Sequence, residues 1–168
     1  MSQEVLLSVK DLRTEFFSSK TSSVTAIKDV SFDMYRGEVL GLVGESGCGK
    51  SVTSLSIMLL LKDTPGKVTN GSATLDGVNL VEASDAQIRD IRGGKMSMIF
   101  QEPMSALNPS MRIDKQMIET IRLHQDMTKE QALAHAADML KKVGIPDPAR
   151  VLKNYPHQLS GGMSQRVM

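Results

Sequence analysis

The chain has 168 residues, of which 40% are hydrophobic and 23% charged, a balance typical of a soluble globular domain. This composition excludes a disordered tail, a collagen-like repeat and a disulfide scaffold, and the single Cys excludes an internal disulfide or a multi-cysteine zinc site. A net charge of +1 gives no argument for a nucleic-acid or membrane-surface binder.

No targeting or spanning segment is expected. The start of the chain carries acidic Glu4 and a short apolar run at residues 5–7, unlike a secretory signal. The most apolar stretch, residues 57–61, is far shorter than the roughly 20 residues of a membrane-spanning helix. We therefore expect a cytoplasmic chain that does not itself cross a membrane.

Residues up to about 100 are predicted to mix strands and helices. The apolar run 39–43 is typical of a buried strand, the polar residues 18–23 predict a loop, and Asp76-Gly77 between two alternating runs predicts a tight hairpin. A helix is expected at 50–61, ended by Thr64-Pro65-Gly66. Strands are expected at residues 4–10, 30–35, 39–43, 72–75, 78–81 and 96–100.

Capping patterns mark two further helices. Ser84 with Gln87 forms a predicted capping box for a short helix that Gly93-Gly94 closes, and Thr128 with Gln131 forms a second. Beyond a Pro-rich loop at 101–111 the chain is predicted to be helical. The apolar positions expected on its helix faces are Ile113, Met117, Ile118, Ile121, Ala132, Ala136, Met139, Leu140 and Val143.

A phosphate-binding loop is predicted where the sequence Gly-Glu-Ser-Gly-Cys-Gly-Lys-Ser fits G-x-x-x-x-G-K-[ST] between an apolar run and a helix. Glycines let backbone N–H groups turn toward phosphate oxygens, Lys50 would reach the β- and γ-phosphates, and Ser51 would offer its hydroxyl to Mg²⁺. A glycine-rich turn that binds nothing is the alternative, and Cys48 could be a reactive thiol or a plain loop side chain. The residues expected to bind are Gly44, Glu45, Ser46, Gly47, Cys48, Gly49, Lys50 and Ser51.

A second glycine element follows at residues 159–166, Leu-Ser-Gly-Gly-Met-Ser-Gln-Arg. Ser160 is a good N-cap, and the two bare glycines behind it could admit an anion closely. Taken alone, these residues fit a simple helix start equally well.

With both elements in this order, the sequence resembles the ATP-binding cassette (ABC) ATPases. Residues 44–51 match their Walker A motif, residues 159–166 their signature motif, and Gln101 their Q-loop glutamine. Residues 98–109 and 155–158 resemble the oligopeptide, dipeptide and nickel importer branch.

The resemblance implies an α/β fold, a P-loop NTPase with a RecA-like core, an antiparallel β-subdomain and an inserted α-helical subdomain. It divides the chain into a nucleotide-binding core at 1–101 and a helical subdomain at 102–168. In the family's sheet, further strands lie between the Walker A strand and the Q-loop strand. The strands that lie between 39–43 and 96–100 in the family's sheet would therefore be absent, and the C-terminal part of the core would be missing.

ATP and Mg²⁺ are the implied cofactors. Phe16, or Phe17 if the register is off by one, would stack on adenine, although the pair could instead pack the small β-subdomain. Gln101 would contact Mg²⁺ or the attacking water, and Ser51 would be the other metal-binding residue. The residues that would act in trans on nucleotide held by a second ATPase domain are Ser160, Gly161, Gly162 and Gln165.

The implied function is that of an importer ATPase subunit, which couples ATP binding and hydrolysis to uptake of di- or oligopeptides. Its expected partners are a second ABC ATPase subunit in a head-to-tail dimer, two membrane permease subunits and, indirectly, a solute-binding protein, with no nucleic acid. It would work at the cytoplasmic face of the membrane. Nickel or another solute, a nucleotide-binding module without hydrolysis, and another P-loop enzyme such as a kinase are the alternatives.

Two family motifs are not found. No segment qualifies as the Walker B strand with its catalytic Glu, and none of His124, His135 and His157 follows a strand as the switch histidine does. The scattered histidines also predict no metal site. We therefore expect a truncated or partial sequence of a longer ATPase, inactive alone because general base and second metal ligand are missing.

Overall fold

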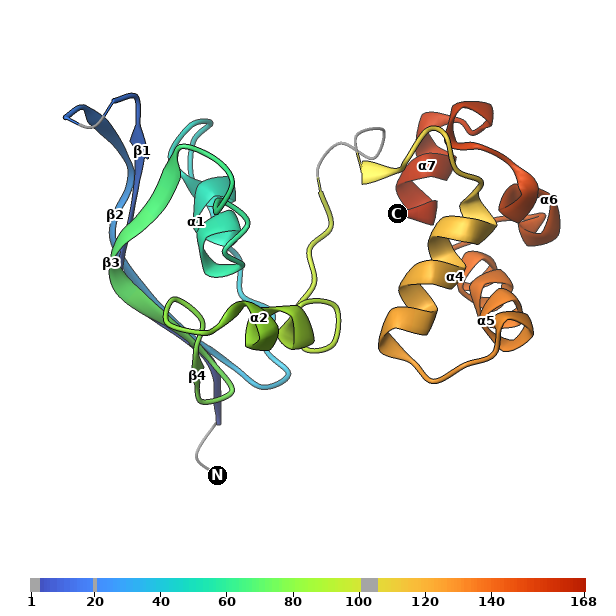
Figure 1. The fold of residues 1–168 in the computed structure, drawn as a ribbon, viewed down its shortest axis with the longest axis horizontal. Helices are drawn as coiled ribbons and strands as arrows, with labels where there is room; N and C mark the ends of the chain where they lie inside the picture. Colours follow the sequence, from blue (N-terminus) through green and yellow to red (C-terminus); the bar gives the residue numbers. More distant parts are fainter. Residues whose placement is uncertain (1–3, 20, 101–105) are drawn as a thin grey trace. The chain divides into compact units, whose positions relative to one another are not determined.

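The computed structural model describes residues 4–19, 21–100 and 106–168. The chain divides into two compact units, Met1–Met96 and Ser97–Met168, which are described separately (Figure 1). Within the described ranges, no helix is long and apolar enough to span a membrane.

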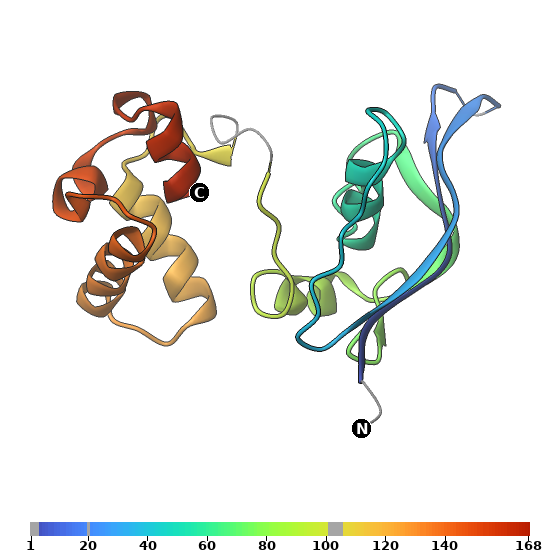
Figure 2. The same cartoon turned by 180° about the vertical axis from the view of Figure 1, so that it is seen from behind.

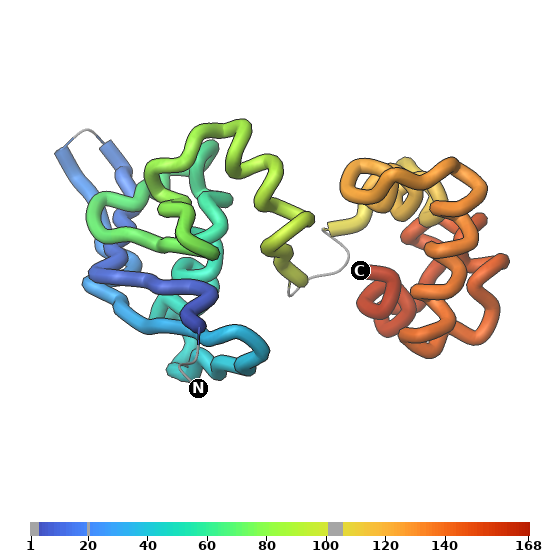
Figure 3. Tube along the Cα trace, turned by 90° about the horizontal axis from the view of Figure 1, so that it is seen from below, coloured from blue at the N-terminus to red at the C-terminus, as the bar shows by residue number. Residues whose placement is uncertain are grey.

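The first unit is built on a four-stranded antiparallel sheet with the strand order β2-β1-β3-β4. β1 (Val5–Phe17) and β2 (Ser23–Tyr35) form a long hairpin, which Figure 3 shows clearly. β3 (Gly66–Leu75) and β4 (Val78–Asn79) flank Asp76-Gly77, where both residues have positive φ. The predicted loop is confirmed at residues 18, 19, 21 and 22, residue 20 lies outside the described residues, and β2 begins at Ser23. The predicted Asp-Gly hairpin is confirmed as well.

The strands bend at irregular positions that no sequence pattern indicated. The register of β1 shifts against both neighbours, and Asp11 and Asp29 have left-handed backbones. A Cβ at Gly71 would lie 2.4 Å from the carbonyl oxygens of Lys10 and Asp11, so only glycine fits this close approach.

Helix α1 (Lys50–Ile57) lies against one face of the sheet (Figures 1 and 2). The buried hydroxyls of Thr14 and Ser56 are 2.8 Å apart and form a hydrogen bond. This hydrogen bond links the helix to β1. The core beneath consists of Leu7, Val9, Leu12, Ile27, Ile57, Ala73, Leu75, Leu80, Ile88 and Ile91.

The prediction that α1 runs to Leu61 was wrong. Leu59 adopts a left-handed conformation (φ 53°), its N–H donates to Ser56, and the N–H of Leu60 donates to Leu55. This is the hydrogen-bond pattern of a Schellman C-terminus, which usually has glycine at the left-handed position. Because a leucine stands at this position, no glycine marks the end of the helix in the sequence.

The expected strands at 39–43 and 96–100 were also wrong. Neither run pairs with another strand among the described residues, and only an isolated bridge joins Arg92 to Met96. Val39 and Val43 are 96% and 90% exposed, and Ile99 is 77% exposed. Both runs have the composition of buried strands, but a strand forms only where a neighbour takes its hydrogen bonds.

Helix α2 (Asp85–Ile91) completes the first unit, and its predicted capping box is confirmed. Ser84 accepts from the N–H of Gln87, whose side chain accepts from the N–H of Ser84.

The second unit is helical, as expected. It contains α4 (Ile113–His124), α5 (Lys129–Lys142), α6 (Pro148–Lys153), the short 3₁₀ turn η1 (Pro156–Gln158) and α7 (Gly161–Val167). The capping box of Thr128 and Gln131 is confirmed. The core is made by Ile113, Ala136, Leu140, Ile145, Val151, Leu152 and Leu159.

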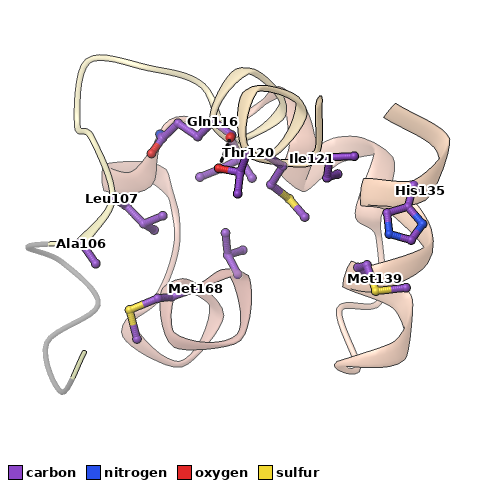
Figure 4. A pocket seen from close by; sticks show the side chains of 11 residues that line it. Ala106, Leu107, Gln116, Thr120, Ile121, His135, Met139 and Met168 are labelled. Atoms are coloured by element: carbon purple, nitrogen blue, oxygen red, sulfur yellow. Dashed lines mark hydrogen bonds between the residues drawn. The ribbon is translucent and has the colours of Figure 1, made fainter. Parts of the chain in front are cut away.

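A cavity of about 350 Å³ opens beside this core (Figure 4). Its wall is mostly apolar, and Gln116, Thr120 and His135 supply the polar groups. Met139, predicted on the buried face of α5, lines this cavity, whereas Val143 is 46% exposed because α5 has ended before it.

Candidate nucleotide site

The predicted phosphate loop leads directly into α1. The chain between the turn at Arg36-Gly37 and α1 forms neither strand nor helix, and residues 44–48 are exposed. A turn closed by the N–H of Cys48 and the carbonyl of Glu45 (3.3 Å) curls the loop. The loop therefore presents its backbone at the surface, where a ligand can reach it.

Gly49 joins the loop to the helix in a conformation that favours glycine. It is the N-cap of α1 with φ 95°, and a Cβ there would lie 2.6 Å from Ile27 Cγ2 and 2.9 Å from the Ala26 carbonyl oxygen. The loop thus packs closely on β2 at this point. The sequence motif required a glycine at 49 but did not indicate its partners in β2.

The N-terminus of α1 carries no side-chain cap. Gly49, the N-cap residue, has no side chain that could accept a hydrogen bond from the backbone N–H groups of the first turn, and this turn contains no acidic residue. Such an end presents unsatisfied N–H groups and the positive end of the helix dipole. This combination binds phosphate groups in many proteins.

Lys50, the first residue of α1, folds back across the loop. Its Nζ donates to the carbonyl oxygens of Gly44 and Glu45, both at 2.7 Å, and lies 3.7 Å from Cys48 Sγ. The ammonium group is therefore held over the backbone of the loop rather than extended into solvent. Ser51 follows on the exposed surface of the same turn.

The donor set fits the phosphate groups of a nucleotide. Free N–H groups and an ammonium would hold phosphate oxygens, and the Ser51 hydroxyl is a hard oxygen ligand of the kind that Mg²⁺ prefers. The other predicted metal-binding residue, Gln101, lies outside the described residues. In the described ranges no three His, Cys, Asp or Glu side chains cluster as a metal site.

The two phenylalanines lie on opposite faces of β1. The Thr14 hydroxyl contacts Ser56 of α1. Successive side chains of a strand point to opposite faces of the sheet, so Phe16 lies on the same face as Thr14 and Phe17 on the other. A Cβ at Gly66 would lie 2.9 Å from the Phe16 ring, so this ring covers that glycine. The Phe17 ring lies 5.8 Å from Lys67 Nζ.

The signature residues begin α7 in the second unit. Ser160 is the N-cap, and its Oγ accepts from the N–H of Met163 at 3.3 Å. Gly161 and Gly162 are exposed with open space where a Cβ would stand, and Gln165 is exposed on the next turn. Behind the Ser160 cap, the first two residues of α7 therefore carry no side chain, as expected.

Arg166 is a residue that sequence reasoning missed. Its Nη1 donates to the Gly144 carbonyl at the end of α5 (3.1 Å), and its Nε donates to the Gly162 carbonyl (3.2 Å). The guanidinium therefore ties the signature turn to α5. No local pattern indicates this contact, because its two ends are 22 residues apart in the chain.

Comparison with known proteins identifies the family. The ABC transporter family profile matches residues 27–168, so the chain belongs to the ABC transporter family. The solved bacterial ABC transporter cassette MJ0796, in its dimeric structure, superposes with a TM-score of 0.80 and 26% identity, covering 96% of this chain and 66% of that one. A post-hydrolysis structure of MJ0796 bound to ADP and Pi superposes with a TM-score of 0.81. The predicted α/β fold of the P-loop NTPase class is therefore confirmed.

Curated relatives point to the importer branch. The chain is 48% identical over 165 residues to the dipeptide transport ATP-binding protein DppD of Bacillus subtilis, covering 98% of this chain and 49% of the relative. It is 46% identical over 168 residues to the glutathione import ATP-binding protein GsiA of Escherichia coli O157:H7, covering 97% of this chain and 27% of the relative. The chain thus spans about half of one relative and about a quarter of the other.

Proposed function

We propose that this chain binds ATP with Mg²⁺ through residues 44–51 and forms the nucleotide-binding part of an ABC importer ATPase for peptides. The observation that carries the proposal is the uncapped, exposed start of α1 with Lys50 folded over it. The relatives named for dipeptide and glutathione import support the solute class.

The proposed binding step is an exchange of partners at Lys50. Its ammonium now bonds two neutral carbonyl oxygens, and charged phosphate oxygens would make stronger, charge-assisted hydrogen bonds. Ser51 would place its hydroxyl on Mg²⁺, and Phe16, on the face of β1 that contacts α1, is the preferred adenine platform. When bound, MgATP would supply the free energy of hydrolysis.

The partners follow from the family. Ser160, Gly161, Gly162 and Gln165 would meet nucleotide held by a second ATPase subunit in a head-to-tail dimer, and Gln101 would link the nucleotide to the helical unit. Two permease subunits and a solute-binding protein would complete the importer, with this chain at the cytoplasmic face of the membrane.

Replacing Lys50 with Ala tests the nucleotide proposal. Calorimetric titration with MgATP should show at least about tenfold weaker binding, because the loop loses the charge that holds the phosphates. Lys28→Ala removes an equal charge from the exposed surface of β2 and should bind as the native chain does. Equal affinity in the Lys50 variant would contradict the proposal.

Uptake measurements in cells test the solute class. A strain that carries Lys50→Ala in the full-length protein should lose uptake of labelled dipeptides and retain uptake of nickel. Loss of nickel uptake with dipeptide uptake intact would assign the protein to nickel import instead.

A further inference from the structure

Glu45 is the one acidic residue of the phosphate loop, residues 44–51, and it is exposed. Among the residues that the structure describes, no Lys, Arg or His pairs with its carboxylate. In the proposed function the loop holds phosphates through its backbone N–H groups and Lys50, and Ser51 offers its hydroxyl to Mg²⁺. A negative charge beside such a site repels the ligand, so the carboxylate of Glu45 needs a role of its own.

The geometry of the loop keeps this charge close to the ammonium group that would hold the phosphates. Lys50 Nζ lies 2.7 Å from the carbonyl oxygen of Glu45. With standard bond lengths, even a fully extended Glu45 side chain keeps its carboxylate within about 10 Å of that ammonium, whichever rotamer it adopts. This distance is about one Debye length at about 0.1 M ionic strength, so the field of the carboxylate reaches the bound ligand.

The side chains of the loop supply no net positive charge. Lys50 is the only cation of residues 44–51, and Glu45 offsets it. Arg36, at the turn before the loop, is already paired with Glu4 and Asp76. Attraction to phosphates therefore depends on the N–H groups and the dipole at the start of α1, which act at short range. The net charge of the ligand then decides how strongly the carboxylate opposes binding.

We propose that Glu45 makes the loop selective for nucleotide complexed with a divalent cation, because its carboxylate repels free ATP more strongly than MgATP. Free ATP carries about four negative charges at neutral pH and MgATP about two, so the same carboxylate opposes the free nucleotide about twice as strongly. This inference rests on the proposed nucleotide function and adds to it the chemical form of the ligand.

Calorimetric titration of the 168-residue chain with ATP, in excess Mg²⁺ or in EDTA, tests the proposal. The measured quantity is the ratio of the dissociation constant of free ATP to that of MgATP. Glu45→Gln should tighten the binding of both forms and lower this ratio about threefold, and Glu45→Lys should lower it about tenfold. Glu45→Asp keeps the charge and should keep the native ratio, as should Glu119→Gln at an exposed position of α4.

Ionic strength supplies a second measurement. At about 1 M salt the Debye length falls to about 3 Å, so the ratio in Glu45→Gln should become equal to that of the native chain. A difference that persists at this salt concentration would overturn the proposal, because the effect of the substitution would then not be one of charge.

An unchanged ratio in both Glu45→Gln and Glu45→Lys would also overturn the proposal. So would weaker MgATP binding with free ATP unaffected, because the carboxylate would then be a metal ligand. Lys50→Ala distinguishes these failures from that of the proposed function. If it weakens MgATP binding while the Glu45 variants keep the native ratio, the selectivity alone is wrong. If it leaves MgATP binding intact, both the proposed function and the selectivity are wrong.

Discussion

Gly49 fixes where the phosphate loop sits on the sheet. Its left-handed backbone strains any other residue, and an added Cβ would collide with Ile27 and with the backbone of Ala26. We predict that Gly49→Ala lowers the free energy of unfolding of the first unit by about 2 kcal/mol, measured by urea unfolding. Gly41→Ala, in the same connection but with open space and no positive φ, should stay within about 0.5 kcal/mol of the native chain. Equal losses would show that the contact with β2 does not hold the loop.

Asp76 makes the hairpin between β3 and β4 sensitive to acid. Lys95 Nζ (2.9 Å) and Arg36 Nη2 (2.6 Å) bond its carboxylate, and these cations, Lys95 first, lower its pKa. A lowered pKa stabilises the folded chain above the ordinary carboxyl value of about 4, and this contribution is lost as pH falls through the folded-state pKa.

The expected result is a smaller acid effect in Asp76→Asn. Asparagine also tolerates the left-handed conformation at this position, so the turn should persist. Thermal unfolding between pH 7 and pH 3 should therefore depend less steeply on pH than in the native chain. An unchanged slope in the Asp76 variant would rule out this ion pair as a source of acid sensitivity.

At the scale of elements, Arg166 couples the signature turn to the end of α5. Its hydrogen bonds to two carbonyl groups also place a positive charge at the C-terminal end of α5, where it is favourable. Replacing it with Met keeps the aliphatic stem and removes both bonds, which should cost about 1 kcal/mol in the unfolding of the helical unit. Gln165→Met on the same helix should cost less than about 0.5 kcal/mol, and a similar loss in both variants would refute the coupling.

The sequence predicted the elements whose signals are local. Both capping boxes depend on residues three positions apart, and the Asp76-Gly77 hairpin depends on adjacent ones. These signals were reliable because the interacting groups are neighbours in the chain.

Non-local features escaped prediction. The apolar runs 39–43 and 96–100 indicated strands, but hydrophobicity does not reveal whether a pairing neighbour is present. The C-terminal end of α1 and the contact of Gly49 with β2 likewise depend on backbone conformation and on distant residues. At the site, the motif predicted the loop residues 44–51, but it did not indicate the residues of β2 on which Gly49 packs.

At the scale of the whole molecule, the two motifs that define the family lie in separate compact units. Residues 44–51 belong to the first unit and residues 159–166 to the second, and each unit has its own hydrophobic core. The family match covers both units. Nucleotide binding by the first unit, at the start of α1, can therefore be tested residue by residue.

Amide NMR spectra of the ¹⁵N-labelled chain during titration with MgATP test that claim most directly. We predict that the N–H signals of Gly47, Gly49, Lys50 and Ser51 shift most, that adenosine alone leaves them unmoved, and that Lys50→Ala suppresses the shifts. Saturating MgATP that leaves the signals of residues 44–51 unchanged, or that shifts chiefly residues outside the first unit, would contradict it.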